Sequence, residues 1–466
     1  MEVYALTLKE YIASLSGKAV TVVGAGISNR PLINLLAEAG ADLTVRDRAD
    51  REALGAFYED NAARGVRFVL GDGYLDGPMG DVVFRTPGVL PLHPALKAAA
   101  EAGSLVTSEM ELFLSLCPCR VFAVTGSDGK TTTTTLVSEL LKAAGYTVWL
   151  GGNIGRPLLP EVDRMAPGDM VVLELSSFQL HSMACAPDVA VITNISPNHL
   201  DVHPTYEDYI DAKKQVYRGQ SADARLVLNL DNEVTAACAG EAPGSVAWFS
   251  RRQAVENGCF MREDGMLCHA AEGEVTALLP ASELLIPGMH NVENMLAAFA
   301  AVWGYAAPEV MRSVARSFTG VAHRLQKVRV LRGVTYINDS IASSPNRTIA
   351  GLACFPEKVI LIAGGKDKGI SYDAVGPAIC EHVKKLFLTG MTAQVIEDAV
   401  RKAPEYREGC PEIYRIDGFD DAIRAAAAEA GEGDVVLLSP ASTSFDRFKN
   451  FEERGDRFRR VVEELI

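Results

Sequence analysis

Short apolar runs that end in polar or glycine-rich segments recur along the whole chain. Clear examples are AVTVVGAG at 19–26, the residues 121–124, DMVVLELSSFQL at 169–180 and DVAVITNISPNHLDVH at 188–203. Runs of this kind predict buried parallel strands, which deliver side chains to the carboxyl edge of their sheet. Largely apolar stretches with helical spacing lie between several of them. The pattern therefore predicts an α/β fold.

The apolar runs fall into three segments that all reuse the βα scheme. Further strands are expected at 41–47, 81–89, 224–232, 323–340, 357–365, 384–390 and 434–440, and a loop followed by an apolar helix at 284–302. Because 466 residues exceed what one core usually organises, separate domains are expected. We expect three: a Rossmann-like domain at 1–107, a central P-loop ATPase-type parallel sheet at 108–322, and a Rossmann-like domain at 323–466.

The stretch AVTGSDGKTTTTT places a glycine-bracketed turn directly behind the strand at 121–124. Small residues between Gly126 and Gly129 let backbone N–H groups curve around a phosphate, and the following helix adds its positive end. Lys130 can place a charge on phosphate oxygens, and the Thr131 hydroxyl can coordinate Mg²⁺. The Gly-x-x-Gly-Lys-Thr spacing is two residues tighter than the usual P-loop, so the sequence predicts a P-loop variant. Only the first one or two threonines need to contact nucleotide or metal.

The first segment carries its own glycine turn, at Gly24 and Gly26, with Asp47 placed 21 residues beyond Gly26 where a ribose-binding acid often sits. Asn29 occupies the position of the third glycine of the dinucleotide fingerprint. A dinucleotide site, a plain α/β turn and a site for another nucleotide all remain open at this point.

Other polar residues follow predicted strands. Glu174 stands near the end of an apolar strand, where an ionised carboxylate needs a partner such as Mg²⁺ or an outlet to solvent. Asn153, in the turn GGNIG, could hold an oxyanion or carboxylate. His199 follows another strand and is either structural or a ligand. Lys213, taken alone, has the pattern of a solvated helix lysine.

Composition narrows the function classes. Lys and Arg total 45 against 60 Asp and Glu, and the net charge of −15 argues against a broad nucleic-acid or anionic-membrane surface. The nine cysteines show no repeated metal spacing and fit reduced thiols. No stretch reaches the roughly 18 apolar residues of a membrane span. We expect a cytoplasmic protein, a monomer, with neither nucleic acid nor membrane as a partner.

Taken in order, the motifs resemble those of the Mur ligases, the ATP-dependent amide-forming enzymes of peptidoglycan precursor synthesis. The resemblance is carried by TGSDGKTT, GGNIG, LELSSFQL, TNISPNHLD, the DAK at 211–213, GMHNVEN, HRLQ, NDSIASSP, AGGKDKG and LLSPASTSFDRFKNFEERGDRF. With GAGISN and VRD it covers nearly the whole chain. The glycine-lysine loop and the C-terminal block look most like the members that add D-glutamate to UDP-N-acetylmuramoyl-L-alanine through an acyl phosphate.

The resemblance implies cofactors: ATP, two Mg²⁺ ions and a CO₂-derived carbamate on Lys213. By this likeness the ATP contacts are Gly126, Ser127, Asp128, Gly129, Lys130, Thr131 and Thr132 in the loop, Asn291 and Asn294 beside adenine, and Arg324 and Asp339 from the third domain. Thr131, Glu174, His199 and carbamylated Lys213 would be the metal ligands, and Lys130, Glu174, His199 and Lys213 the catalytic set. A carbamate would turn a repelling ammonium into an anionic oxygen ligand.

The resemblance also implies substrate contacts. Asp47 and Arg48 match positions near uracil, and Asn153, Ser176 and Gln179 lie on the muramoyl-alanine path. The D-glutamate contacts would be Ser343, Lys368, Ser444 and Phe451. Ile341 stands where the family commonly has lysine, and Lys366 where it often has aspartate, so the carboxylate contacts depart from the family pattern.

Three alternatives accompany this hypothesis. A folylpolyglutamate synthase or the ligase that adds the third peptide residue would share the phosphate loop. The former would begin almost at that loop, whereas about 120 residues precede it here, and the latter would carry a different Arg-containing motif in its last domain. A nicotinamide oxidoreductase would need the missing third glycine. A P-loop motor or regulatory ATPase would call for a basic track, which the charge does not support.

Overall fold

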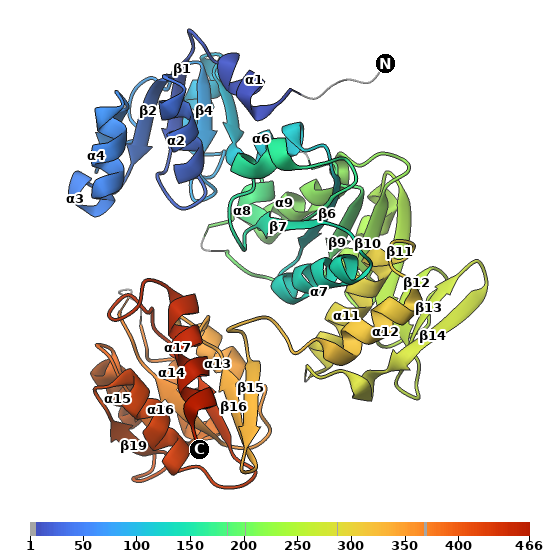
Figure 1. Cartoon of the computed structure of the whole chain (residues 1–466), viewed down its shortest axis with the longest axis vertical. Coiled ribbons are helices and arrows are strands. Elements are labelled where there is room, and N and C mark those ends of the chain that lie inside the picture. The colour runs from blue at the N-terminus through green and yellow to red at the C-terminus, as the bar shows by residue number, and fades with distance from the viewer. Residues whose placement is uncertain (1–5, 184, 201, 287, 368–370) are drawn as a thin grey trace. The chain divides into compact units, whose positions relative to one another are not determined.

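The computed structural model describes residues 6–183, 185–200, 202–286, 288–367 and 371–466. It contains three β-sheets flanked by helices, coloured along the chain in Figure 1. The chain divides into two compact units, residues 1–317 and 318–466. The first unit holds two of the sheets and the second unit holds the third. The α/β class expected from the sequence is confirmed, whereas the domain boundaries at 107 and 322 stay a prediction.

The first sheet is parallel, with strand order β3-β2-β1-β4-β5. Its strands are β1 Ala19–Val23, β2 Asp42–Asp47, β3 Arg67–Leu70, β4 Val82–Arg85 and β5 Leu105–Ser108. Helices α1 Leu8–Ala13, α2 Arg30–Glu38, α3 Arg51–Leu54, α4 Ala56–Ala63 and α5 Pro94–Glu101 accompany it. The order reverses between β1 and β4, so the glycine turn after β1 opens at a topological switch point, where α/β sheets bind ligands.

The second sheet has nine strands in the order β14-β13-β12-β11-β10-β9-β6-β8-β7. They are β6 Arg120–Thr125, β7 Val148–Gly152, β8 Met170–Glu174, β9 Val189–Ile192, β10 Arg225–Asn229, β11 Ser245–Ser250, β12 Gly258–Met261, β13 Met266–Ala271 and β14 Glu274–Pro280. The strands from β7 to β12 pair in parallel, and β13 and β14 add antiparallel hairpins. Because β6 lies between β8 and β9, the chain's second switch point falls at the end of β6.

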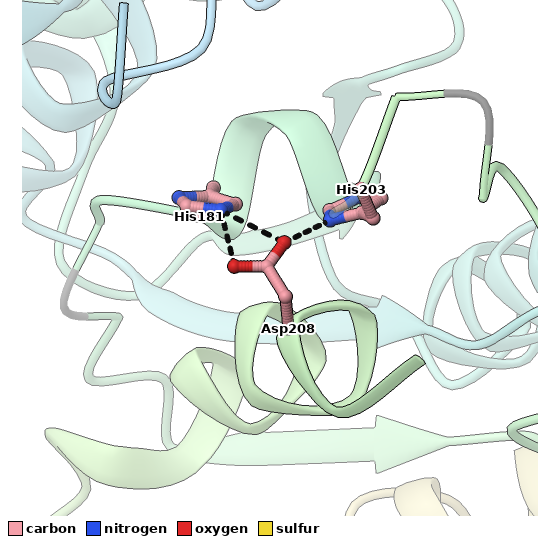
Figure 2. Close-up of side chains that lie close together, drawn as sticks. All are labelled: His181, His203 and Asp208. Carbon is pink, nitrogen blue, oxygen red and sulfur yellow. Dashed lines mark hydrogen bonds and ion pairs between the residues drawn. The ribbon is translucent and has the colours of Figure 1, made fainter. Parts of the chain in front are cut away.

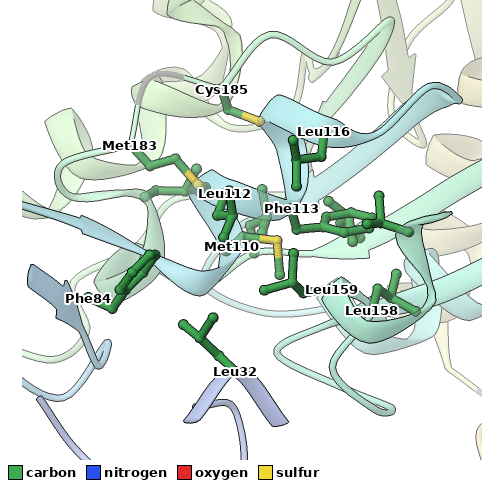
Figure 3. Close-up of a cluster of buried hydrophobic side chains, with 14 of the residues drawn as sticks. Leu32, Phe84, Met110, Leu112, Phe113, Leu116, Leu158, Leu159, Met183 and Cys185 are labelled. Atoms are coloured by element: carbon green, nitrogen blue, oxygen red, sulfur yellow. The ribbon is translucent and has the colours of Figure 1, made fainter. Parts of the chain in front are cut away.

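Helices of the same segment are α6 Glu109–Leu116, α7 Lys130–Ala143, α8 Ser177–Leu180, α9 Tyr206–Arg218, α10 Glu233–Ala237, α11 Met289–Val302 and α12 Pro308–Ser317, with 3₁₀ turns at η1 Leu159–Arg164, η2 Cys238–Glu241 and η3 Ala281–Glu283. α6 packs its apolar side into a core shared with α2, β4 and η1 (Figure 3). Leu32, Phe84 and Phe113 are fully buried there. This shared core joins the first two sheets.

The third sheet has the order β15-β16-β20-β17-β18-β19, with β15 antiparallel and the rest parallel. Its strands are β15 Gln326–Leu331, β16 Val334–Asn338, β17 Val359–Ala363, β18 Val383–Leu388, β19 Glu412–Arg415 and β20 Val435–Leu438. Helices α13 Pro345–Leu352, α14 Val375–His382, α15 Ala393–Lys402, α16 Phe419–Ala428 and α17 Phe451–Glu464 cover its two faces in two separate cores. Among the helices of the described residues, none combines the length and apolarity needed to cross a membrane.

Candidate active site

The loop between β6 and α7 depends on its glycines. Gly126 has φ +148°, and a Cβ there would lie 1.9 Å from Thr193 Oγ1. Gly129 has φ +77°, and a Cβ there would lie 2.2 Å from Asn294 Oδ1. Both positions therefore exclude a side chain. The loop leads into α7, whose first residue is Lys130, so the N-terminal end of the helix dipole favours an anion there.

The threonines that follow differ in their hydrogen-bond partners. Thr133 and Thr134 are fully buried, and the hydroxyls of Thr134 and Thr135 donate to the backbone carbonyls of Lys130 and Thr131, each at 2.8 Å. These threonines are thus engaged within the helix. Thr131 and Thr132 remain at its first turn, beside the loop.

Two lysines converge on the first residue of the loop. Lys130 Nζ donates to the carbonyls of Gly126 and Ser127, both at 2.9 Å, and Lys213 Nζ donates to the Gly126 carbonyl at 2.7 Å. Lys213 is only 1% exposed, so the structure contradicts a solvated helix lysine. Burial first, and the nearby Lys130 charge second, hold the pKa of Lys213 well below its ordinary value. Its amine is therefore disposed to be neutral and nucleophilic.

Glu174 ends β8 beside this loop, with Val124 of β6 as its register partner. Its side chain is buried, and Oε1 accepts a hydrogen bond from Asn153 Nδ2 at 2.7 Å. Oε2 is also buried and has no hydrogen-bond partner within the described residues. A buried carboxylate oxygen without a partner is costly. It fits an oxygen-preferring cation such as Mg²⁺, held beside the phosphate loop.

Residues directly after β9 form hydrogen bonds with the phosphate loop. They were not among the site residues predicted from the sequence. Asn194 Oδ1 accepts from the Asp128 N–H at 3.0 Å, and Thr193 Oγ1 donates to the Asp128 carbonyl at 2.5 Å. The Ser127 hydroxyl lies 2.9 Å from the hydroxyl of Tyr209, whose ring lies 4.6 Å below Lys213 Nζ. Thr193 and Asn194 could have been predicted from their position directly after a buried strand.

His199 lies in the loop after β9 and has φ +55°. Its ring meets the ring of Phe178 edge-on at 5.1 Å and lies 6.4 Å from that of Tyr209. The residue is exposed. Its place near Tyr209 is compatible with the ligand role suggested by the resemblance.

Asn294 ties α11 to the same loop. Its Oδ1 accepts from the Thr133 hydroxyl at 3.3 Å, and its Nδ2 donates to Asn291 Oδ1 at 3.1 Å. The two asparagines predicted to lie on the adenine side thus contact each other, and Asn294 borders the phosphate loop.

The predicted muramoyl-alanine residues lie near β8 and α8. Ser176 and Gln179 form a capping box at α8, with the Ser176 hydroxyl donating to Gln179 Oε1 at 2.9 Å. Gln179 also lines a pocket with Ser28, Asn29, Arg85, Pro87, Ser108, Glu109 and Met110. Buried oxygens of Asn29 and Glu109 in that wall have no hydrogen-bond partner within the described chain. The pocket therefore suits a polar ligand.

Asp47 closes the glycine turn of the first sheet. Its Oδ2 accepts from the Ala25 N–H at 2.5 Å and its Oδ1 from the Ala49 N–H at 2.7 Å, while Arg48 is exposed. Both carboxylate oxygens thus have backbone partners.

The second unit assembles its own candidates. Asp339 accepts from the Leu325 N–H at 3.2 Å and the Ser439 hydroxyl at 2.8 Å, next to Arg324, and burial raises its pKa to about 7. Arg454, which the sequence did not single out, is 2% exposed and donates to the carbonyls of Ser340 and Ser442.

Among the predicted D-glutamate positions, Phe451 is linked to Arg454 through Ser340, whose hydroxyl accepts a hydrogen bond from Arg454 Nε. The Ser340 hydroxyl donates to the Phe451 carbonyl at 2.8 Å, and Ser444 is buried. The Ser343 N–H donates to the Ile341 carbonyl at 2.7 Å. Lys368 lies outside the described residues.

Comparison with known proteins decides the family. Residues 124–302 match the model of the Mur ligase middle domain, and residues 323–442 match that of the Mur ligase glutamate ligase domain. The UDP-N-acetylmuramoylalanine–D-glutamate ligase of Acetivibrio thermocellus is 52% identical over 462 residues, covering 98% of this chain and 99% of that protein. The chain belongs to the Mur ligase family. The match to the Mur ligase middle domain begins at Val124 and ends with α11, so it contains the whole phosphate loop, Glu174 and Lys213.

Further relatives agree with the Mur ligase assignment. The ligase of the same name from Ruminiclostridium cellulolyticum is 48% identical over 461 residues, 98% of this chain and 99% of that one. The fold is also that of a solved UDP-N-acetylmuramate–alanine ligase from Thermotoga maritima, with a TM-score of 0.55 at 18% identity, over 96% of this chain and 99% of the other. Membership of the Mur ligases decides against the oxidoreductase and motor ATPase alternatives.

Proposed function

We propose that this Mur ligase adds D-glutamate to UDP-N-acetylmuramoyl-L-alanine, using ATP and passing through an acyl phosphate, in peptidoglycan precursor synthesis. The observation that carries the proposal is the 52% identity, over nearly all of both chains, to a ligase of that name. The geometry agrees with it, because a phosphate loop, a buried lysine and a carboxylate oxygen that has no hydrogen-bond partner among the described residues meet at one switch point.

The phosphate loop supplies the ATP contacts of the proposal. The residues from Gly126 to Thr132 contact the phosphates, and Lys130 exchanges its carbonyl partners for phosphate oxygens. Asn291 and Asn294 lie on the adenine side. Arg324 and Asp339 from the second unit meet the phosphate and ribose.

The cation ligands lie around Glu174. Thr131 and Glu174 hold a magnesium ion, and His199 serves a second. Lys213 carries a carbamate: its neutral amine attacks CO₂, a nitrogen–carbon bond forms, and one proton is released. The lowered pKa of Lys213 supports this step, since the free amine and not the ammonium is the nucleophile. Bound magnesium supplies charge neutralisation during phosphoryl transfer.

The reaction then requires the protein to position three substrates. An oxygen of the L-alanine carboxylate attacks the γ-phosphorus of ATP, ADP leaves, and the D-glutamate amine attacks the resulting acyl phosphate. The new amide forms as phosphate leaves and the nitrogen loses a proton. Asp47 and Arg48 contact the uridine end, and Asn153, Ser176 and Gln179 align the muramoyl-alanine arm. Ser343, Lys368, Ser444 and Phe451 bind D-glutamate.

The proposal also covers the enzyme's cellular location, its partners and its domains. The enzyme works in the cytoplasm as a monomer, without nucleic acid or membrane partners, and supports cell wall synthesis, cell shape and division. Its domains are 1–107 for the UDP substrate, 108–322 for ATP and 323–466 for the amino acid.

The deciding assay is ATP-dependent phosphate release with UDP-N-acetylmuramoyl-L-alanine, Mg²⁺ and bicarbonate. D-glutamate, L-glutamate, meso-diaminopimelate and L-lysine are compared, with the product mass confirmed. We expect release and a new amide only with D-glutamate. Turnover with a different amine would reassign the substrate, and a folded, ATP-binding protein inactive with all four would refute the proposal.

A further inference from the structure

A cluster of two imidazoles and one carboxylate lies outside the residues assigned above. His181 caps the C-terminus of α8, His203 lies in the loop before α9, and Asp208 belongs to the first turn of α9. Asp208 Oδ1 lies 3.0 Å from His181 Nε2, and Asp208 Oδ2 lies 2.6 Å from His203 Nδ1 (Figure 2). Their ligand atoms all fall within 4.8 Å of one another, the one such group of at least three found in the described chain.

The surroundings hold both rings in place. His203 is buried, and its Nε2 lies 3.0 Å from the Ser177 hydroxyl, which leaves Nδ1 facing the carboxylate. Its ring stacks on Phe178 at 5.5 Å with an interplanar angle of 12°. A hydrogen-bond partner on the second ring nitrogen is the usual way in which a protein orients a ligating histidine. The ring of His203 is thus oriented before any ion arrives.

The cluster remains reachable from solvent. The side chains of His181 and Asp208 are 9% and 23% exposed, whereas that of His203 is fully buried. A site with three protein ligands and one open side is typical of zinc with an exchangeable fourth position. Two imidazole nitrogens are ligands for zinc-class ions rather than for magnesium, which prefers oxygen.

We propose that His181, His203 and Asp208 bind a transition-metal dication of the zinc class. The ion takes the place of the hydrogen bonds that now join the ring nitrogens to the carboxylate oxygens, and each imidazole binds it through the nitrogen without a proton while the other ring nitrogen carries the N–H. Ligand atoms around tetrahedral zinc stand about 3.3 Å apart, so the nitrogen–oxygen distances of 3.0 and 2.6 Å each need to lengthen by less than about 1 Å. The bound ion fastens the turn after α8 to the start of α9. This site is separate from the magnesium ligands and independent of the proposed amino-acid specificity.

Cobalt titration of the full chain tests the site. Excess Mg²⁺ is included to occupy oxygen-ligand sites, and Co²⁺ serves as the probe because a four-coordinate nitrogen and oxygen site gives strong visible absorption. We expect one equivalent of Co²⁺ bound with this spectrum, displaced by Zn²⁺. His181→Ala and Asp208→Asn should each weaken Co²⁺ binding at least tenfold and remove the band. Zn²⁺ should raise the melting temperature of the wild type but not of Asp208→Asn.

Two controls separate the cluster from other histidines. His199→Ala removes a proposed magnesium ligand, and His382→Ala removes a histidine of the second unit; both should keep the Co²⁺ band. Circular dichroism and ATP binding confirm that each variant is folded. If wild type shows no saturable Co²⁺ band, or if His181→Ala and Asp208→Asn both bind Co²⁺ as wild type does, the cluster is a hydrogen-bonded triad only and the proposal is overturned.

Discussion

At the residue scale, Lys213 is the strongest test of the carbamate. Its Nζ is buried, bonds the Gly126 carbonyl at 2.7 Å and lies near Lys130, so an unmodified ammonium there is unfavourable. We expect Lys213→Ala to lower kcat by at least about a hundredfold. Formate or acetate should restore part of the lost kcat, because a small carboxylate can enter the space left by the lysine side chain and supply the missing oxygen ligand. The measurement is phosphate release with and without these acids.

Lys214 is the matched control for this prediction. It follows Lys213 on α9, but its Nζ pairs with Glu241 at 2.6 Å and not with the Gly126 carbonyl. Lys214→Ala should keep nearly full activity and show no response to formate. Equal losses in the two variants, or a Lys213→Ala enzyme that no short acid stimulates, would argue against a carbamate.

Glu174 gives the second residue-scale prediction. Its Oε2 is buried without a partner in the described chain, while Oε1 is held by Asn153. Glu174→Gln keeps the shape and the Asn153 contact but removes the charge, so the Mg²⁺ concentration for half-maximal activity should rise at least tenfold. A magnesium titration of steady-state activity measures it. Glu139→Gln, at a half-exposed position on α7, should leave the titration unchanged.

At the element scale, the junction of the loop with α7 depends on Gly129. Gly129→Ala places a Cβ 2.2 Å from Asn294 Oδ1 and strains a residue at φ +77°. The loop or α11 must shift, so we expect ATP affinity to fall at least tenfold by calorimetry. Gly145→Ala, just past the same helix, has φ +95° and no atom within 4 Å of the new Cβ. It carries the strain of about 1–2 kcal/mol without the clash and should bind ATP normally.

Most of the buried parallel strands, such as β1, β6, β8, β9, β17 and β20, were predictable from sequence because each is an apolar run ending in polar residues. Strands β3, β7, β11 to β14 and β19 were missed: β3, β7, β14 and β19 are exposed or half-buried over most of their length, and β13 and β14 pair in an antiparallel hairpin. The phosphate loop and Glu174 could be located from their spacing. The contact of Asn294 with Gly129 could not, since the two are far apart in the chain. The burial of Lys213 and the cluster of His181, His203 and Asp208 could not be predicted from sequence either, because both depend on how α8 and α9 pack.

At the scale of the whole molecule, the described residues of each compact unit include a buried carboxyl whose pKa is raised to about 7. Burial raises the pKa of Glu109 in the first unit from 4.5 to about 7, and that of Asp339 in the second from 3.8 to about 7. All three tryptophans, at 149, 248 and 303, belong to the first unit. Tryptophan fluorescence therefore reports the unfolding of the unit that contains Glu109.

The sign of the pH effect follows from proton uptake. Between pH 4.5 and about 7 the folded chain keeps a proton on Glu109 that the unfolded chain has released. Raising the pH through this window therefore lowers the free energy of unfolding, by at most about 3 kcal/mol for this group. Buried His323 and Lys213, whose pKa values are lowered, act in the opposite direction. The effect of Glu109 alone is therefore obtained from the difference in the free energy of unfolding between wild type and a variant at this position.

Glu109→Gln provides that difference, because glutamine stays neutral at every pH, like the protonated acid. We expect the free energy of unfolding of Glu109→Gln relative to wild type to grow between pH 5 and pH 8, by up to about 3 kcal/mol. Urea unfolding followed by tryptophan fluorescence measures it. Glu101→Gln, an exposed position, should give a difference that does not vary with pH. A pH-independent difference for Glu109→Gln would mean that this carboxyl is already ionised in the folded chain, with a cation or water supplying the partner its buried oxygen lacks.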